Sequence, residues 1–458
     1  MKSDQANWKS MPLEEWMEAI IDYRGKTPAK TSAGIPLITA KIVKAGRIME
    51  PEEFIAEEDY ETWMRRGMPK PGDVVLTTEA PLGEVAQLDD RKVALAQRII
   101  TLRGKPDLLD NTYLKFALQG SFIQEQLHGR ASGSTVTGIK QSELRKMPLS
   151  FPNIQQQKSV AKILGSLDNK INTNRRINQT LEAMAQAIFK SWFVDFDPVK
   201  AKIAAKQTGR DPLRAAMSAI SGKSAAELDT LPPEQYHQLA TTAELFPDAL
   251  VALTLSAVPS GWSYQAAEAL SEVGIGKTPP RKESEWFTDG VGDWRWVSIR
   301  DMGSSGVFQR QSSEFLTADA VSRFNVRVVP DRTVILSFKL TVGRVAITDG
   351  PMVTNEAIAH FRLADDACLS PEYLYLYLKG FDYSTLGSTS SIADAVNSKT
   401  IRDMPIIVAN RDLIDRFTKI VSPIFEEIRN RQNEIASLQA TRDALLPKLL
   451  SGEIEVPI

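Results

Sequence analysis

Two stretches of the chain carry apolar residues at alternating steps of three and four, which is the 3.5-residue spacing of a coiled-coil helix. The first stretch runs from Val160 to Trp192, and the second runs from Ile414 to Leu449. Either helix alone would expose its apolar stripe, so each needs a partner helix, and the available partner is the other one. We predict two spacer helices, at residues 153–196 and 410–453, that pair with each other.

The expected interface between these helices is largely apolar, with polar exceptions near its middle. Asn174, Asn178, Arg431 and Arg442 interrupt the stripes. Buried polar groups of this kind fix the register of coiled coils, and we expect them to contact one another across the pair. The predicted interface residues are Leu164, Leu167, Ile171, Asn174, Asn178, Leu181, Ile188, Val421, Ile428, Ile435, Leu438 and Leu445.

The segment ahead of the first spacer helix has the pattern of an α+β domain. Residues 74–77 and 98–102 are short β-branched runs bounded by Gly, Pro and Asp, as strands are. Residues 111–126 show helical spacing, and Asn111 is the expected N-cap.

This α+β segment occurs twice, about 250 residues apart. The matching strings keep their order: 25–28 with 276–279, 71–77 with 330–337, 82–86 with 342–346, 113–114 with 373–374, and 147–148 with 404–405. A period this long indicates two whole domains rather than small repeats. We place them at residues 1–152 and 259–409 and call them the first copy and the second copy. Two similar but unequal domains suit a target that has two unlike halves.

Residues 197–258 separate the first spacer helix from the second copy. They are rich in Ala, Lys, Pro and Ser and show no strand pattern. We expect a connector with one or two short helices.

Composition narrows the class of protein. A chain of 458 residues can form two or three domains with full cores. The start lacks an apolar signal region, and no apolar run approaches the ~18 residues of a membrane span. A single cysteine, Cys368, excludes an internal disulfide, so we expect a cytoplasmic protein. The three scattered histidines do not form a recognisable metal-ligand set.

The net charge of −2 argues mildly against a nucleic-acid partner, but the distribution of charge matters more. Residues 23–47 contain six basic side chains and no acidic one, and the acidic run at 50–61 is best interpreted as a solvated face. Lys277, Arg281 and Lys282 recur at the equivalent place in the second copy. This recurrence favours a phosphate-facing role for the basic residues.

Motifs for catalysis are missing. The Gly-Lys-Thr strings lack the first glycine of a phosphate loop, and proline follows where a helix should begin, so a turn preceding a strand is the better interpretation. We find no Asn/Asp-Pro-Pro-aromatic motif of amino-methyltransferases, no Gly-x-Ser-x-Gly, no His-Glu-x-x-His and no Cys-x-x-Cys. We therefore expect neither catalytic nor metal-binding residues in this chain.

Several strings resemble one family, the specificity subunits of type I restriction–modification systems. Phe-Lys-Ser-Trp-Phe-Val-Asp-Phe-Asp-Pro-Val at 189–199 is similar to the first central region of these proteins. Leu-Leu-Pro-Lys-Leu-Leu-Ser-Gly-Glu-Ile at 445–454 is similar to the end of their second helix. The Gly-Lys-Thr-Pro pairs, the string at 71–76 and Gln-Gln-Gln-Lys at 155–158 resemble their repeat elements. The resemblance covers essentially the whole chain.

The resemblance implies an α+β protein with two target-recognition domains separated by a pair of long antiparallel coiled-coil helices. Each domain would bind one half of a bipartite double-stranded DNA sequence. Two modification (methyltransferase) subunits would dock on the chain, and restriction motor-nuclease subunits would join for cleavage. S-adenosylmethionine, ATP and Mg are then expected in the partner subunits, and no cofactor is expected in this chain.

We expect DNA contacts from the turn-rich edges of each copy, because exposed Lys, Arg, Ser and Thr can reach phosphates and base edges. The residues predicted to bind DNA are Lys26, Thr27, Lys30, Ser134, Thr135, Lys140, Lys277, Thr278, Arg281, Lys339 and Arg344.

Two other interpretations remain open at this stage. The chain could be the specificity subunit of a related system in which nuclease and methyltransferase are fused. It could also be a coiled-coil adaptor that carries two ligand modules and does not bind DNA.

Overall fold

The computed structural model describes residues 8–23, 27–133, 136–252, 257–288, 292–386 and 396–456. The chain divides into two compact units, one formed by Met1–Thr173 with Ile435–Ile458 and the other by Asn174–Glu434. The first unit holds the first copy, and the second unit holds the connector and the second copy. Two long helices, α6 (Ile154–Phe193) and α17 (Arg411–Ser451), contribute residues to both units.

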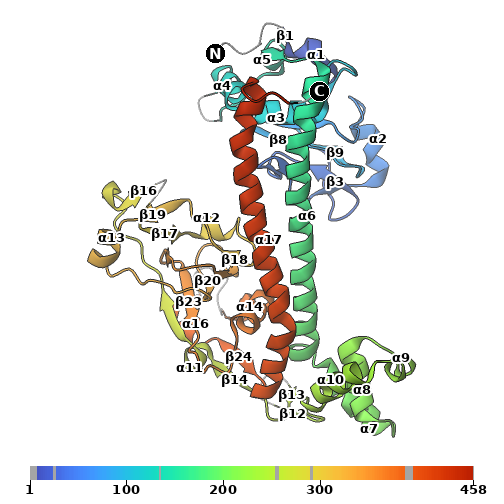
Figure 1. Cartoon of the computed structure of the whole chain (residues 1–458), viewed down its shortest axis with the longest axis vertical. Helices are drawn as coiled ribbons and strands as arrows, with labels where there is room; N and C mark the ends of the chain where they lie inside the picture. Colours follow the sequence, from blue (N-terminus) through green and yellow to red (C-terminus); the bar gives the residue numbers. More distant parts are fainter. Residues whose placement is uncertain are drawn as a thin grey trace. The chain divides into compact units, whose positions relative to one another are not determined.

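The first copy is an α+β domain, as predicted (Figure 1). Its central sheet has the strand order β2-β10-β7-β8 and is antiparallel throughout. The strands of this copy are β1 (Lys9–Pro12), β2 (Met17–Asp22), β3 (Ile35–Ile38), β4 (Val43–Lys44), β5 (Arg47–Ile48), β6 (Phe54–Ile55), β7 (Val74–Thr78), β8 (Leu82–Gln87), β9 (Ala94–Leu95), β10 (Ile99–Gly104) and β11 (Pro148–Phe151). Its helices are α1 (Leu13–Trp16), the 3-10 turn η2 (Glu57–Asp59), α2 (Tyr60–Trp63), α3 (Asn111–Gln119), α4 (Ser121–Gly129) and α5 (Gln141–Arg145).

The helix predicted at residues 111–126 is two helices, and its predicted cap is wrong by one residue. Asp110 is the N-cap, because its side chain accepts a hydrogen bond from the Tyr113 backbone N–H at 2.9 Å. Gly120 takes an extended conformation (φ −65°, ψ 141°), which ends α3 and begins α4. The apolar spacing continues through this break, so periodicity alone could not reveal it.

The second copy has the same kinds of element (Figure 1). Its strands are β14 (Ser263–Ala266), β15 (Glu272–Ile275), β16 (Phe287–Thr288), β17 (Trp294–Val297), β18 (Phe308–Gln309), β19 (Glu314–Leu316), β20 (Val334–Ser337), β21 (Val345–Thr348), β22 (Val353–Thr354), β23 (Ile358–Arg362) and β24 (Pro405–Val408). Its helices are α11 (Ala267–Leu270), η3 (Ser284–Trp286), α12 (Ile299–Met302), α13 (Ala318–Arg323), α14 (Pro371–Gly380), η4 (Tyr383–Leu386) and α16 (Ser398–Arg402).

The repeat read from the sequence is matched in the register of the strands. Val74 pairs with Gln87 in the first copy, and Val334 pairs with Ile347, 260 residues further along each strand. The order β15-β23-β20-β21 repeats β2-β10-β7-β8, and β18 extends it by one strand. The parallel pair β3–β9 recurs as β17–β22. The two copies therefore share one backbone pairing scheme as well as short strings.

The connector is more ordered than predicted, and the expectation of one or two short helices is wrong. It contains α7 (Asp197–Gln207), α8 (Pro212–Ser221), α9 (Ala225–Asp229) and α10 (Pro233–Glu244), followed by the hairpin strands β12 (Leu250–Ala252) and β13 (Ala257–Pro259). Buried Ala216, Met217, Leu228 and Ala243 give it a small core of its own. Its high alanine content concealed this core, because small apolar residues make a weak periodic signal.

The two long helices contact each other within each unit, and the pairing is antiparallel. In the first unit Arg442 Nη1 donates to Asp168 Oδ1 at 2.8 Å. In the second unit Arg431 Nη1 donates to Asn174 Oδ1 at 3.0 Å, and Asn178 Nδ2 donates to the Ile428 carbonyl at 3.5 Å. Residue numbers thus rise along one helix as they fall along the other. Each interrupting polar side chain contacts the opposite helix, but only Asn174 and Arg431 contact each other.

The predicted interface residues differ in burial along the helix pair. Those that are fully buried are Leu164, Ile171, Asn174, Val421 and Ile428. Those that are half-buried are Leu167, Asn178, Leu181, Ile188, Ile435, Leu438 and Leu445. The described helices include none with the length and apolar character that crossing a membrane would require.

Candidate nucleic-acid interface

In each copy, segments far apart in the sequence meet at one end of the central sheet. In the first copy Gln97 Nε2 donates to Thr27 Oγ1 at 2.9 Å, and the Thr78 N–H donates to the Arg98 carbonyl at 2.9 Å. In the second copy Thr278 Oγ1 donates to the Glu356 carboxylate, and the Phe338 N–H donates to the Ala357 carbonyl at 2.9 Å. Three described segments therefore form one edge in each copy, which we call the turn edge: the segment that contains Thr27 or Thr278, the turn after β7 or β20, and the approach to β10 or β23.

The Gly-Lys-Thr-Pro segment of the second copy follows strand β15 and does not lead into a strand, contrary to our expectation. Its first residue, Gly276, donates its N–H to the Ile358 carbonyl at 3.0 Å. A Cβ atom at Gly276 would lie 2.2 Å from the Asn355 carbonyl oxygen, so only glycine allows this close approach. Lys277, whose N–H donates to the Thr354 carbonyl at 2.9 Å, is thereby held at the turn edge with its side chain exposed.

A cleft of about 360 Å³ opens at the turn edge of the first copy, lined by Thr78, Glu79, Gln97, Arg98, Ser132, Val136, Gly138, Ile139 and Lys140. Arg98 Nε and Glu79 Oε1 form an ion pair at 2.8 Å. The Ile139 N–H donates to the Thr78 carbonyl at 3.0 Å, which ties the loop before α5 to the end of β7. The cleft is thus lined by a basic side chain (Arg98), an acidic side chain (Glu79) and a side-chain amide (Gln97), which can bind a polar ligand.

The structure places the predicted DNA-binding residues in different surroundings. Lys26, Ser134 and Thr135 lie outside the described residues. Lys140, Lys277 and Lys339 are exposed, and none of the three forms an ion pair with a described residue. Lys30 Nζ lies 2.9 Å from Glu53 Oε1, and Arg344 Nη1 donates to the Ile299 carbonyl at 2.6 Å. Assignment of these residues to DNA contact stays a prediction.

Arg281 is held more firmly than the other predicted residues. Its guanidinium donates to both Glu314 oxygens, at 2.6 and 2.9 Å, and lies over the rings of Phe287 and Trp296. The hydrogen bonds that Arg281 donates to Glu314 raise the pKa of Arg281 above its usual value. A phosphate would have to compete with this bidentate pair, whereas Lys277 and Lys339 form no ion pair with a described residue.

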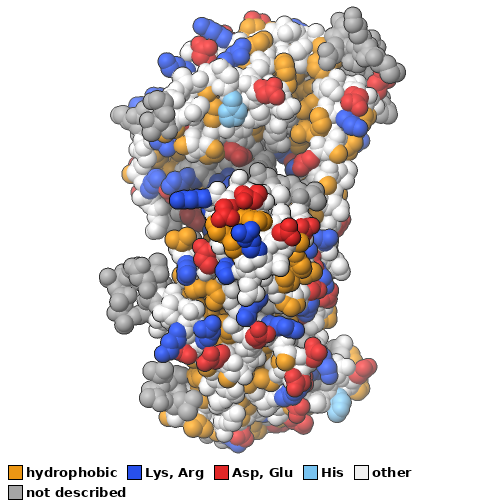
Figure 2. Space-filling model, turned by 90° about the vertical axis from the view of Figure 1, so that its left-hand side faces the viewer, with side chains coloured by type: hydrophobic (Ala, Val, Ile, Leu, Met, Phe, Trp, Pro, Cys, Tyr) orange, Lys and Arg blue, Asp and Glu red, His pale blue; other side chains and the backbone are white. Residues whose placement is uncertain are grey.

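Charge on the surface is mixed. Figure 2 shows basic, acidic and apolar side chains interspersed on the face that it draws. Attraction of DNA through charge alone needs several uncompensated cations, because each phosphate contact adds to the salt-dependent part of the affinity. Two of the described cations predicted to face DNA, Lys30 and Arg281, are already paired with carboxylates, which reduces the electrostatic contribution of the turn edges.

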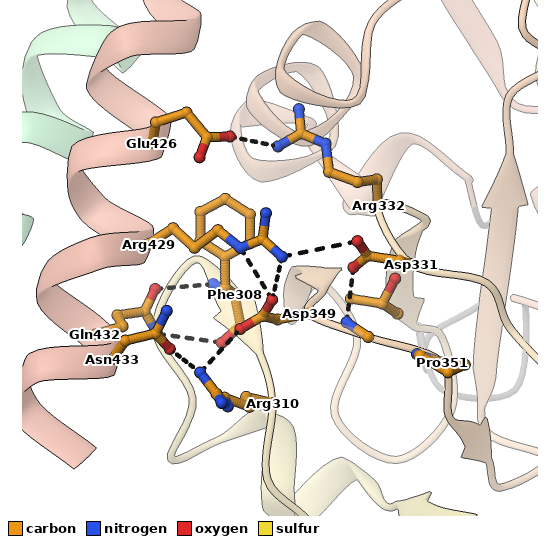
Figure 3. A network of polar contacts seen from close by, with 12 residues as sticks. Phe308, Arg310, Asp331, Arg332, Asp349, Pro351, Glu426, Arg429, Gln432 and Asn433 are labelled. Atoms are coloured by element: carbon orange, nitrogen blue, oxygen red, sulfur yellow. Dashed lines mark hydrogen bonds and ion pairs between the residues drawn. The ribbon is translucent and has the colours of Figure 1, made fainter. Parts of the chain in front are cut away.

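A polar network fastens the second copy to α17 within the second unit (Figure 3). Gln432 accepts from the Phe308 N–H at 3.0 Å and donates to the Phe308 carbonyl at 3.1 Å. Arg429 Nε donates to buried Asp349 at 2.9 Å, and this carboxylate also lies 3.6 Å from Arg310. Arg429 therefore has a pKa raised by its hydrogen bond to Asp349. These directional bonds fix the orientation of β18 and the end of β21 on the helix.

The first copy is fastened within the first unit by a smaller, more buried set. Lys115 of α3 pairs with Asp168 of α6, and Arg442 of α17 donates to the other oxygen of Asp168. Gln157 of α6 accepts from the Asp110 N–H at 3.0 Å and donates to the Leu108 carbonyl at 3.1 Å. Each copy is thus bound to the helices by charged and amide groups around an apolar contact.

Four further residues at the turn edges were not predicted from the sequence: Glu79, Gln97, Arg98 and Leu340. A signal was present in the aligned repeat, because Gln97 and Glu356 occupy matching positions, at the ends of 94–97 and 353–356. Their shared role, a hydrogen bond to the threonine of Gly-Lys-Thr-Pro, depends on spatial proximity that spacing does not show.

Comparison with known proteins agrees with this duplicated architecture. The family profile described as "Type I restriction modification DNA specificity domain" matches residues 6–183 and 259–438. The chain is 36% identical over 335 residues to the type I restriction enzyme HindI specificity subunit of Haemophilus influenzae, covering 70% of this chain and 72% of that protein. It is 24% identical over 418 residues to the type I restriction enzyme MjaIX specificity subunit of Methanocaldococcus jannaschii, covering 89% and 83%.

A solved structure shows the same fold. The type I restriction–modification S subunit from M. genitalium superposes with a TM-score of 0.51 at 15% identity, covering 97% of this chain and 96% of that one. Two separate matches to one family profile account for the two copies. The chain belongs to the type I restriction–modification DNA specificity family.

Proposed function

We propose that this chain is the DNA-recognition subunit of a type I restriction–modification complex and that each copy contacts one half of a bipartite target through its turn edge. The observation that carries the proposal is the duplicated turn edge. The same three segments meet in both copies, on the same strand pairing, but present different side chains. A common scaffold with unlike contact residues suits two unlike half-sites.

The chain itself performs no chemistry in this proposal. Two modification subunits would supply S-adenosylmethionine-dependent methylation, and restriction subunits would use ATP and Mg. Support for docking comes from the long helices, which keep apolar surface beyond their mutual contact. Met184 of α6, for example, is 50% exposed. We expect a modification subunit to cover this side chain.

The near-neutral net charge of the chain predicts that its affinity for DNA depends on the modification subunits. With a net charge of −2, the isolated chain should bind a random duplex weakly, and specific binding should tighten when modification subunits are added. A gel shift with and without a modification subunit measures this. Tight, specific binding by the chain alone would contradict the proposed dependence on modification subunits. If DNA is bound neither with nor without a modification subunit, a non-DNA adaptor is favoured.

The helix pair is proposed as the spacer that sets the gap between half-sites. Inserting four residues after Asn178 lengthens α6 by ~6 Å and by about one turn, so the apolar stripe stays on the same face. At 3.4 Å per base pair, the preferred gap should grow by about two base pairs while both half-sites stay the same.

Sequencing of methylated positions on DNA modified by the assembled complex measures gap and half-sites together. The matched control inserts four residues after Gly222, an exposed residue with left-handed φ (+69°) between α8 and α9, and should leave the gap unchanged. New half-site sequences with the old gap would refute the spacer role.

A further inference from the structure

The turn between β20 and β21 carries an apolar side chain that packing in the fold does not account for. Leu340 is 86% exposed, more than any other large apolar residue among those described. Its φ of +60° lies in the left-handed region, which favours glycine or asparagine over leucine. The left-handed conformation disfavours leucine and no packing in the fold favours it, so we take a role in binding as the reason for leucine at this position.

The turn is held in one conformation by its own hydrogen bonds. Ser337 Oγ donates to the Thr341 carbonyl at 2.6 Å and accepts from the Arg344 N–H at 3.0 Å. The Gly343 N–H donates to the Ser337 carbonyl at 3.0 Å. Leu340 is therefore presented on a fixed support, which lowers the entropy lost when it meets a ligand.

The surroundings of Leu340 indicate the ligand. Lys339, next to it, is an exposed cation, and the Phe338 N–H joins the turn to Ala357 at the turn edge that also bears Lys277. An exposed apolar group next to a cation without an ion-pair partner, on an edge that carries a second such cation, fits a polyanion that also displays apolar groups. Duplex DNA is such a ligand, since its major groove admits a two-stranded β-ribbon and displays the thymine methyl group.

We propose that the β20–β21 turn enters the major groove of the second copy's half-site, where Leu340 contacts a thymine methyl and Lys339 contacts a phosphate. This inference rests on the proposed function. The first copy cannot make the same contact, because its turn presents Glu79 and Ala80, and Glu79 is paired with Arg98 at 2.8 Å. The thymine preference therefore belongs to one half-site only.

The test begins with the complete complex, this chain with its modification subunits, selecting its target from a random duplex library. Duplexes of that target are then made with thymine or deoxyuridine, which lacks the methyl group, in each half-site in turn. Wild type is compared with Leu340→Asn, which suits left-handed φ and so keeps the turn, and with Leu340→Met, which keeps the apolar contact. The control is Val328→Ala, which shortens an apolar side chain that is 37% exposed and lies before the start of β20.

Wild type, Leu340→Met and Val328→Ala should bind the deoxyuridine duplex about fourfold more weakly than the thymine duplex, in one half-site only. Leu340→Asn should bind the thymine duplex about tenfold more weakly than wild type. It should bind the thymine and deoxyuridine duplexes equally well, because the protein change and the DNA change remove the same contact. Its melting temperature should be at least that of wild type.

Three outcomes would overturn the inference. Leu340→Asn could retain wild-type affinity and sequence selection, or it could remain as sensitive to deoxyuridine as wild type. The third outcome is that Leu340→Asn loses affinity and no longer bends DNA, while wild type does not depend on the thymine methyl group. Leu340 would then act as a wedge between base pairs. A wild-type complex that selects no sequence at all would refute the proposed function itself, which is a separate result.

Discussion

In the first copy, Lys115 of α3 forms a buried ion pair with Asp168 of α6, and Arg442 also binds this carboxylate. In the second copy, the residues at the positions of Lys115 and Asp168 are Tyr375 and Phe425. Their rings meet edge to face, with centroids 5.7 Å apart. The strands around these contacts keep the same register. At this one position the contact with the helix is ionic in the first copy and aromatic in the second, although the strand register is the same and other contacts of the second copy with α17, such as Arg429 with Asp349, are ionic.

The turn edges differ in the same way. Thr27 and Thr278 keep equivalent hydrogen bonds, but the turn tip carries Glu79 in the first copy and Lys339 in the second. At this turn the hydrogen bond of the threonine is shared by the two copies, whereas the side chain at the tip differs in charge. Side chains at the tips are therefore the ones to change when target preference is to be altered without loss of the fold.

The largest effect is expected from breaking the ionic attachment of the first copy. Asp168→Ala leaves Lys115 and Arg442 buried without their shared counter-charge, which should destabilise the first unit by about 3–5 kcal/mol. Urea unfolding measures the change. Asp443→Ala is the control, because this carboxylate also bonds to Arg442 but is 63% exposed, and its loss should cost less than about 1 kcal/mol. If Asp168→Ala and Asp443→Ala are equally stable, the buried ion pair is not an important part of the attachment of the first copy.

A second difference between the copies concerns pH. Buried His360 on β23 occupies the position of Thr101 on β10, and burial, with a smaller contribution from the charge of Arg327, lowers the pKa of His360 to about 3. Below pH 6.5 the unfolded chain binds a proton that the folded chain excludes, so this histidine lowers stability as pH falls from 6.5 towards 3.

At pH 5 the loss should be about 2 kcal/mol relative to pH 7.5. His360→Gln, which cannot titrate, should lose less stability over this range than wild type does, as measured by urea unfolding of both proteins at both pH values. An identical pH dependence in the two proteins would mean that His360 is protonated in the folded state.

The smallest effect is expected at the turn tips. Lys339→Gln should weaken DNA binding by the assembled complex uniformly across sequences and reduce the salt slope by ~1, because one phosphate contact is lost. Glu79→Gln should not weaken binding, since its charge is already paired. Lys223→Gln, in the connector, controls for net charge. A drop in affinity with Glu79→Gln that equals the drop with Lys339→Gln would remove the proposed distinction between the tips.

Much of the fold could be predicted because its signals are periodic or repeated. The heptad stripes predicted both long helices, and the duplicated strings predicted two α+β domains. Prediction failed where local chemistry outweighs periodicity. Gly120 breaks a helix whose apolar spacing continues, and the alanine-rich connector forms four helices around a core of small residues.

The candidate interface was predicted less completely. Lys277 and Lys339 could be proposed from charge and exposed turns, but Arg281 turned out to be engaged by Glu314 and two aromatic rings. Leu340 was missed because an apolar residue in a sequence is expected in a core. Its significance comes from exposure and backbone conformation, which only three-dimensional structure supplies.

The division of the chain into Asn174–Glu434 and a unit made from both of its flanks has a consequence for synthesis. Leu449 belongs to the buried core of the first copy, and Arg442 completes its ion pair. Residues 174–434 leave the ribosome in between, which takes tens of seconds at ~5–20 residues per second. The first domain to be translated is thus the last to be completed, and during that interval its unfinished apolar surface is a natural substrate for a chaperone.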